Sequence, residues 1–236
     1  MIRLDKVTSG FGRLTILREI DLSLDVGELV LVLGANGAGK TTLLRTISGL
    51  AQIRSGRITF DGKDITRAEA HRLARSGLVH VPQGRQIVPH LTVEENLMIG
   101  AQHVPDVSGR IMAERLEAEY ERFPVLKQRR HVLGGSLSGG EQQMLAVSRG
   151  LMMGPRVLML DEPSLGLAPQ AIHRILVAVE ALTRQGISVL MVEQKTSALR
   201  FAQRALVLRN GAIVYSGQAQ ELADSDALMR HYGGTG

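Results

Sequence analysis

The sequence contains no cysteine and no tryptophan, and aromatic residues occupy only 3% of its 236 positions. The lack of cysteine excludes disulfides, cysteine-ligated zinc, iron–sulfur clusters and thiol catalysis. The scarcity of aromatic rings disfavours a reader of single-stranded nucleic acid, because such proteins stack bases on aromatic side chains. We therefore expect neither a redox protein built on thiols nor a nucleic-acid partner.

Long apolar runs are missing as well. No segment approaches the ~20 consecutive apolar residues of a membrane-spanning helix, and the first residues do not follow the pattern of a signal peptide. The contents of 44% hydrophobic and 22% charged residues are ordinary for a globular α/β domain, which we expect to span residues 1–236. If the protein works at a membrane, partners must hold it there.

A glycine-rich motif follows an apolar segment near the start of the chain. Residues 29–33 are all leucine or valine, which is typical of a buried strand, and residues 43–47 favour a helix. Between them lies a match to G-x-x-x-x-G-K-[ST], which is called the P-loop here and includes one further threonine. It comprises Gly34, Ala35, Asn36, Gly37, Ala38, Gly39, Lys40, Thr41 and Thr42.

The spacing of the P-loop has a direct physical reason. Glycines let the backbone wrap closely around phosphate oxygens, and successive N–H groups then form an anion nest at a helix N-terminus. Lys40 is expected to reach the β- and γ-phosphates of a nucleotide, and the Thr41 hydroxyl to bind Mg²⁺. The motif predicts a nucleotide site but does not say what the nucleotide is used for.

Two further segments carry chemistry. The apolar residues 157–160 end in Asp161 and Glu162, a position from which Asp161 can bind Mg²⁺ and Glu162 can polarise an attacking water. A helix-capping acidic pair is the alternative interpretation. Ser138, Gly139 and Gly140 open a predicted helix and repeat the physics of the P-loop. The P-loop already gives one chain its phosphate-binding site, so we expect this second site to bind the nucleotide of another subunit.

Phe11 is one of only four phenylalanines and lies in what we predict to be a polar loop upstream of the P-loop. An exposed aromatic ring there could stack on adenine, whereas a core or edge position would make it purely structural. The residues alone leave both interpretations open.

The rest of the pattern predicts the order of elements. Residues 2–33 alternate as strands, residues 67–75 favour a helix, and residues 88–150 read as a helical insertion between strands. Further predicted segments are strands 56–62, 77–81 and 187–192, helices 136–153 and 169–185, and a hairpin around Asn210-Gly211. Met112, Leu116, Tyr120 and Phe123 share a helical spacing that we assign to the core.

The ordered motifs resemble the ATP-binding subunits of ABC transporters over nearly the whole chain. The resemblance is carried by the P-loop, by Pro82-Gln83, by 137–143 (LSGGEQQ) and by 160–163 (LDEP). The segments 92–97, 164–169 and 192–194 are most similar to the second ATPase subunit of branched-chain amino-acid importers. Urea-importer ATPases are close relatives, and Pro82-Gln83-Gly84-Arg85 resembles their version.

This resemblance implies a fold and an assembly. The fold is α/β, a P-loop NTPase core of mainly parallel sheet with an N-terminal antiparallel β region and an inserted α-helical subdomain at 88–150. Two ATPase subunits, identical or different, form a head-to-tail dimer around two ATP molecules. Each site uses the P-loop of one chain and Ser138–Gly140 of the other. Phe11 takes the adenine-stacking position, and Gln83 senses Mg²⁺ and couples to the membrane subunits.

The expected function is that of an ATP-hydrolysing subunit that powers import of branched-chain or other hydrophobic amino acids through ATP-driven dimer closure. Its partners are the second ATPase, two transmembrane permease subunits and, indirectly, a periplasmic or extracellular substrate-binding protein. The chain then lies at the cytoplasmic face of the inner or plasma membrane. Lys40, Glu162 and Gln194 are the expected catalytic residues, with Thr41, Gln83 and Asp161 at Mg²⁺.

Two departures from the wider family stand out. Gln194 occupies the place of the usual switch histidine, and Ala168 replaces the usual aspartate after the catalytic glutamate. Glutamine can donate a hydrogen bond to a γ-phosphate but cannot carry a charge. Both departures are similar to the narrower group, so we expect an active enzyme.

Alternative functions are a urea or amide importer ATPase, a soluble ABC ATPase acting on nucleic acid or the ribosome, and a regulator that binds nucleotide without turnover. The single nucleotide-binding unit, without a heptad arm, disfavours the soluble ATPase. The presence of Lys40, Asp161 and Glu162 disfavours the regulator.

Overall fold

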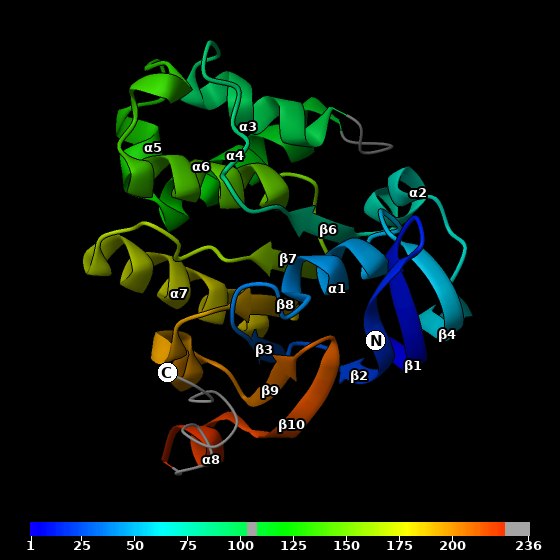
Figure 1. Ribbon diagram of the computed structural model, residues 1–236. Helices are drawn as coiled ribbons and strands as arrows, with labels where there is room; N and C mark the ends of the chain where they lie inside the picture. Colours follow the sequence, from blue (N-terminus) through cyan, green and yellow to red (C-terminus); the bar gives the residue numbers. More distant parts are fainter. Residues whose placement is uncertain (103–107, 225–236) are drawn as a thin grey trace.

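The computed structural model describes residues 1–102 and 108–224, and its centre is a six-stranded sheet (Figure 1). The strand order is β10-β9-β3-β8-β7-β6, and all strands except β10 run parallel to their neighbours. The strands are β3 (Leu29–Leu33), β6 (Leu78–Val81), β7 (Val157–Asp161), β8 (Ser188–Glu193), β9 (Arg204–Arg209) and β10 (Ala212–Gln218).

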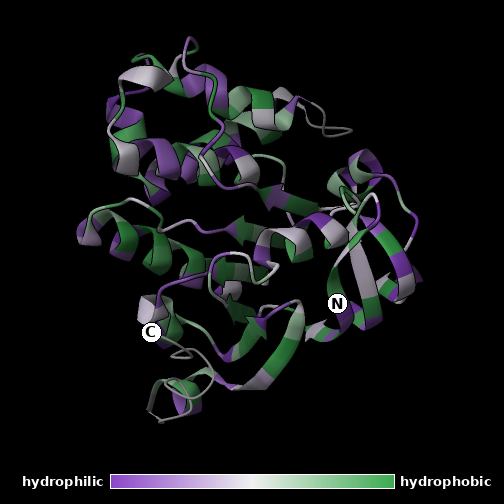
Figure 2. Ribbon diagram, in the orientation of Figure 1, coloured by the Kyte–Doolittle hydropathy of each residue, from purple (hydrophilic) through white to green (hydrophobic). Residues whose placement is uncertain are grey.

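The central strands are apolar because both faces of this sheet are covered. Every residue of β3, β7 and β8 is buried, and Figure 2 shows hydrophobic residues dominating the strands at the centre of the molecule. Continuous runs of leucine, valine and isoleucine are what a sheet covered by other elements on both faces requires. The sequence prediction of buried strands at 29–33, 157–160 and 187–192 is confirmed.

The N-terminal region forms a second, antiparallel sheet of order β2-β1-β4-β5. Its strands are β1 (Ile2–Phe11), β2 (Leu14–Leu24), β4 (Gln52–Phe60) and β5 (Lys63–Asp64). The predicted strand at 56–62 begins earlier, at Gln52, because Gly10 at the far end of β1 pairs with it. Phe11 lies at the end of β1 rather than in a polar loop, so that prediction is wrong.

Four helices lie between the edge strand β6 and β7 and form the upper part of Figure 1. They are α3 (Val93–Ala101), α4 (Gly109–Arg122), α5 (Pro124–Gln128) and α6 (Gly139–Leu151), with a short 3₁₀ turn η1 (Gly134–Ser136). The predicted capping box at Thr92 is present. Tyr120 and Phe123 are buried, and Met112 and Leu116 pack against the same core, as their spacing predicted.

The remaining helices are α1 (Lys40–Ile47), α2 (Ala70–Arg75), α7 (Pro169–Arg184), α8 (Ala219–Asp224) and the 3₁₀ segment η2 (Thr196–Phe201). The helix predicted from residue 67 begins at Ala70, because Ala68 N–H closes a turn onto the Ile65 carbonyl and Glu69 stays extended as the N-cap. Over residues 1–102 and 108–224, no helix has the length and apolar character to cross a membrane.

The predicted hairpin joins β9 to β10 and touches the P-loop. Asn210 and Gly211 have φ angles of 50° and 80°, which is the left-handed pair that a tight hairpin turn requires. The Gly211 N–H donates to the Ala38 carbonyl oxygen at 3.0 Å. A Cβ at Gly211 would lie 1.8 Å from the Ile16 carbonyl oxygen, so only glycine fits there.

His80 on β6 is expected to make folding sensitive to acid. Burial lowers the pKa of His80 from 6.5 to about 4, while the unfolded chain keeps the ordinary value. Between these values the unfolded state binds the proton first, so stability falls as pH drops from 6.5 towards 4, by on the order of 2 kcal/mol. Denaturant unfolding of His80→Asn at several pH values should show a shallower slope in this window. The exposed His90→Asn is the control, and an unchanged slope in His80→Asn would contradict the assignment.

Candidate functional site

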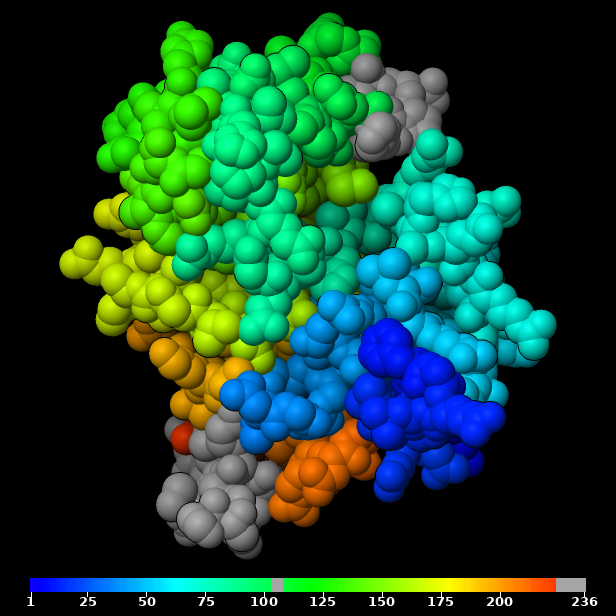
Figure 3. All heavy atoms as spheres, turned by 45° about the horizontal axis from the view of Figure 1, so that its top comes forward, coloured from blue at the N-terminus to red at the C-terminus, as the bar shows by residue number. Residues whose placement is uncertain are grey.

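The P-loop connects the end of β3 to the start of α1, and glycines with positive φ angles allow its backbone to turn tightly. Gly37 and Gly39 adopt positive φ angles of 79° and 109°. A Cβ at Gly39 would lie 2.9 Å from a methyl group of Leu17, so glycine there meets both a conformational and a packing need. In Figure 3 the mid-blue segment that contains the P-loop and α1 lies on the surface facing the viewer, between the dark blue N-terminal strands and the green helical insertion.

Parallel strands place the other polar residues beside this loop. Strands β3, β6, β7 and β8 run in one direction, so their carboxyl ends meet at one edge of the sheet. The P-loop follows β3, Asp161 ends β7, and Gln194 follows β8. Ligands of open α/β sheets bind at this edge. Gln83, two residues beyond β6, is brought to the same place.

Lys40 is a buried cation at the first position of α1. Its side chain is only 4% exposed, and its Nζ donates to the carbonyl oxygens of Gly34 at 2.8 Å and Ala35 at 3.1 Å. The same Nζ lies 3.0 Å from Glu162 Oε1, whose side chain is 6% exposed. The ammonium therefore lies between the start of the P-loop and the Glu162 carboxylate.

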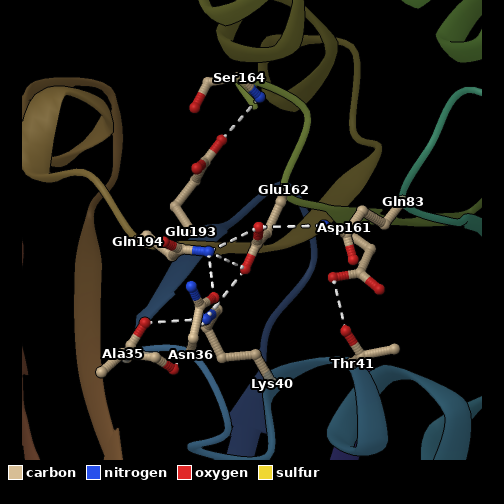
Figure 4. Close-up of polar contacts among 11 residues, drawn as sticks. Ala35, Asn36, Lys40, Thr41, Gln83, Asp161, Glu162, Ser164, Glu193 and Gln194 are labelled. Atoms are coloured by element: carbon tan, nitrogen blue, oxygen red, sulfur yellow. Dashed lines mark hydrogen bonds and ion pairs between the residues drawn. The ribbon is translucent and has the colours of Figure 1, made fainter. Parts of the chain in front are cut away.

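The Glu162 carboxylate is the centre of the polar network (Figure 4). Besides Lys40, it accepts hydrogen bonds from Gln194 Nε2 at 2.9 and 3.0 Å and from Gln83 Nε2 at 3.3 Å. Gln194 Nε2 also lies 2.5 Å from Asn36 Oδ1, which links the end of β8 to the P-loop. The structure thus gathers all three residues predicted as catalytic, and adds a contact to Asn36 that the sequence did not predict.

Asp161 points to a different partner from its neighbour. Its Oδ1 accepts a hydrogen bond from the Thr41 hydroxyl at 3.2 Å, and its buried Oδ2 has no partner among the described residues. Burial raises the pKa of the Asp161 carboxyl, and the Thr41 hydrogen bond opposes that rise. A buried carboxylate oxygen without a partner beside a threonine hydroxyl fits the oxygen ligands that Mg²⁺ prefers.

The described part of the chain contains no group of three or more His, Cys, Asp and Glu side chains that could hold a metal by itself. Mg²⁺ in nucleotide sites commonly binds one or two protein oxygens together with substrate phosphates. The predicted metal ligands Thr41 and Asp161 are adjacent, and each offers an oxygen atom. Gln83 contacts Glu162 and reaches the same edge of the sheet.

The backbone of Glu162 is strained, and the turn that follows it is bound by a buried acid. Its φ angle is 46°, a left-handed conformation that non-glycine residues rarely adopt. Two residues later, Ser164 N–H donates to Glu193 Oε1 at 2.9 Å. Glu193 is 2% exposed, and burial raises its pKa. Glu193 follows an apolar run and lies in the segment 192–194 that carries the resemblance, but we assigned it no role from sequence.

The Ser-Gly-Gly segment (138–140) opens α6, as predicted. Ser138 Oγ accepts the Glu141 N–H at 3.4 Å, and Glu141 Oε2 accepts the Ser138 N–H at 2.8 Å, which forms a capping box. Added Cβ atoms at Gly139 and Gly140 would lie 2.9 Å from the Arg85 guanidinium and 2.7 Å from the Ala171 side chain. Close packing therefore accounts for part of the glycine requirement.

Two cavities border these residues. One of about 300 Å³ is lined by Ile16, Asn36, Gly37, Gly39, Lys40, Thr41, Thr42, Gln83 and Glu162. Phe11, which is 39% exposed, and the Ser-Gly-Gly segment are not among its lining residues. A second cavity of about 590 Å³ runs from Gln83 and Glu162 to Gln142 on α6. One chain thus assembles the P-loop side of the site without Phe11 or the Ser-Gly-Gly segment.

Comparisons with known proteins agree with this geometry. The family model described as "ABC transporter" matches residues 17–165. The chain is 42% identical to the high-affinity branched-chain amino acid transport ATP-binding protein BraG of Pseudomonas aeruginosa, with 91% of each chain covered. It is 35% identical to a probable branched-chain amino acid transport ATP-binding protein LivF of Archaeoglobus fulgidus, covering 98% of this chain and 97% of that protein.

A crystal structure of an ATP-binding cassette of an ABC transporter in its ADP conformation superposes with a TM-score of 0.85 at 29% identity. It covers 100% of this chain, and this chain covers 99% of it. The expected fold class, a P-loop NTPase core with an antiparallel β region and inserted helices, is therefore confirmed. The chain belongs to the family of ATP-binding proteins of ABC transporters.

Proposed function

We propose that this protein hydrolyses Mg²⁺-bound ATP to drive an importer for branched-chain or other hydrophobic amino acids. The observation that carries the proposal is the convergence of Lys40, Glu162 and Gln194 beside a P-loop cavity. Thr41 also borders this cavity and donates a hydrogen bond to Asp161. The relatives named for branched-chain amino-acid transport favour this cargo over the urea or amide alternative.

Phosphate binding would rearrange the network around Lys40. The backbone amides of the P-loop and the Lys40 ammonium are the groups that bind β- and γ-phosphate oxygens. These oxygens compete with Glu162 for Lys40 Nζ, which now lies 3.0 Å from the carboxylate. Glu162 is then available to orient and deprotonate the water that attacks the γ-phosphate. Gln194 Nε2 would donate a hydrogen bond to the same γ-phosphate.

Thr41, Asp161 and Gln83 would hold the Mg²⁺ ion. When bound, the ion neutralises charge on the phosphate oxygens and fixes their orientation. Thr41 and Asp161 are already in contact, so the protein supplies two oxygen ligands from α1 and β7. Chelation of Mg²⁺ by EDTA is therefore expected to stop phosphate release.

A second ATPase subunit is needed to complete the site. The Ser-Gly-Gly segment does not line the P-loop cavity of its own chain, and its helix N-terminus suits a phosphate of the nucleotide on a partner subunit. Phe11 is proposed to stack on the adenine ring, a role compatible with its exposure at the end of β1. Homo- and heterodimers both meet these requirements.

We further propose that the dimer lies at the cytoplasmic face of the inner or plasma membrane, attached to two permease subunits that receive cargo from a substrate-binding protein. Gln83 borders both cavities, which suits a residue that couples nucleotide to permease. The inserted helices, residues 88–150, form a subdomain within the nucleotide-binding domain.

Phosphate release by the purified chain tests the activity. Purification from membranes with a bound amino-acid permease supports the transport role, and its absence contradicts that role.

Gln194→His is expected to retain ATP hydrolysis within about threefold of the unchanged protein. An imidazole N–H can replace the amide donor to Glu162, since the required group is a hydrogen-bond donor and not a fixed charge. Gln194→Leu removes the donor and should lower the rate by at least about tenfold. Steady-state phosphate release measures both, and loss of activity in the histidine variant equal to that in the leucine variant would contradict this role.

A further inference from the structure

Glu193, the last residue of β8, connects both halves of the site. Its backbone carbonyl oxygen accepts the Gly34 N–H at 3.2 Å, at the start of the P-loop. Its side-chain Oε1 accepts the Ser164 N–H at 2.9 Å, in the turn that follows Glu162. Only 2% of Glu193 is exposed, so neither contact is shared with bulk water. Figure 4 shows the bond between Glu193 and Ser164. One residue therefore touches the phosphate loop and the segment that carries the proposed base.

The three residues from Glu162 to Ser164 have two backbone N–H groups, and β8 binds both. Glu162 N–H donates to the Val192 carbonyl oxygen at 3.0 Å, Pro163 has no N–H, and Ser164 N–H donates to Glu193. Glu162 sits between these two attachments with its φ angle at 46°. A strained backbone of this kind persists only where the surrounding structure imposes it.

Loss of the Glu193 acceptor would release one side of this strained turn. Ser164 is only 5% exposed, so its N–H would be buried without a partner unless the segment moved. Relaxation of Glu162 away from its left-handed conformation would turn its carboxylate away from Lys40 and Gln194. Errors of about 1 Å in the position of a catalytic group can cost about 100-fold in rate.

We propose that Glu193 is a positioning residue for ATP hydrolysis, which acts by anchoring the Ser164 amide and so holding Glu162 in its strained, inward-facing conformation. The proposal rests on the proposed function, in which Glu162 orients the attacking water. What Glu193 supplies is an acceptor at the correct reach, because its contact with the Ser164 N–H is a hydrogen bond to Oε1.

Three substitutions of Glu193 test separately the length of its side chain, its charge and its hydrogen-bond acceptor. Glu193→Gln keeps the length and the carbonyl oxygen but removes the charge. Glu193→Asp keeps the charge but shortens the side chain by one methylene, and Glu193→Leu keeps the approximate volume without an acceptor. We expect the glutamine variant to hydrolyse ATP within about threefold of the unchanged protein, and the aspartate and leucine variants to lose about 10- to 100-fold in kcat. The KM for ATP should stay within about threefold, because the P-loop contacts remain.

The measurements are steady-state phosphate release, ATP binding by equilibrium titration, and Tm for each variant. Near-normal hydrolysis by Glu193→Gln, together with a loss confined to kcat in the aspartate and leucine variants, supports the proposal. General destabilisation would instead also lower the amount of protein that binds ATP. Wild-type kcat in Glu193→Asp overturns it, and so does a loss in Glu193→Gln as large as that in Glu193→Leu. If the leucine variant does not fold, the comparison of glutamine with aspartate still decides.

Glu162→Gln separates this proposal from the proposed function. Normal hydrolysis by Glu162→Gln would remove the role of Glu162 and the proposed mechanism with it. If Glu162→Gln is inactive while Glu193→Asp and Glu193→Leu are fully active, the mechanism stands and only the positioning role of Glu193 fails.

Discussion

Glu162→Gln is expected to lower ATP hydrolysis by about 100- to 1,000-fold while ATP binding stays within about threefold. The amide keeps the size of the carboxylate and can accept a hydrogen bond from Gln194 Nε2, but it cannot take a proton from water. Removal of a general base typically costs 100- to 10,000-fold in rate. Single-turnover phosphate release and equilibrium ATP titration measure the two quantities.

The same variant should lengthen the lifetime of the ATP-bound dimer, because a dimer that ATP closes is expected to persist while its ATP is not hydrolysed. Size-exclusion chromatography in the presence of Mg²⁺ and ATP would show this as a persistent dimer peak. Glu114→Gln on α4 is the matched control, since it makes the same chemical change in an exposed ion pair with Arg110. Turnover by Glu162→Gln equal to that of the control would contradict a role for Glu162 as base.

Lys40→Met is expected to abolish ATP binding and also to destabilise the protein without nucleotide, by about 3 kcal/mol. The second effect follows from the structure, because Lys40 and Glu162 are a buried pair 3.0 Å apart and removal of the cation leaves a buried carboxylate short of a partner. Glu162→Gln in the same chain removes the remaining charge. The double variant should therefore recover much of the lost free energy of unfolding.

Urea unfolding of the two single variants and the double variant forms a double-mutant cycle that isolates the coupling of the pair. Lys127→Met serves as the control, because Lys127 and Glu117 form an ion pair in which both side chains are about half exposed. Its loss should cost less than about 1 kcal/mol. Equal destabilisation by Lys40→Met and Lys127→Met would show that burial of the Lys40–Glu162 pair adds nothing to stability.

Local patterns in the sequence predicted the parts of the site whose chemistry depends on neighbours along the chain. The P-loop needs a strand, glycines, a lysine and a helix start in direct succession, and all of these are visible in residues 29–47. Asp161 was identified in the same way, as a carboxylate at the end of an apolar run. The buried strands followed from their composition, because few other environments tolerate five consecutive apolar residues.

Contacts between strands that are distant in sequence could not be predicted in this way. The bond between Gln194 and Asn36 depends on the pairing of β8 with β3, and no local pattern specifies that pairing. Glu193 received no role from its position at the end of an apolar run, although it is buried and holds Ser164. Phe11 was predicted to lie in a loop, but it is the last residue of β1, because the pairing of β1 with β2 extends to Phe11 and Leu14.

The order of strands in the large sheet also sets when the nucleotide site can form during synthesis. Leu29 pairs with Val189 on one side of β3, Val30 pairs with Arg204 on the other, and Gly211 supports the P-loop through Ala38. At about 5 to 20 residues per second, a ribosome makes the P-loop roughly 7 to 30 seconds before β8, the first of the strands that flank β3. ATP can therefore stabilise the finished chain but not its nascent precursor, in which the apolar β3 has not yet paired with β8 and β9.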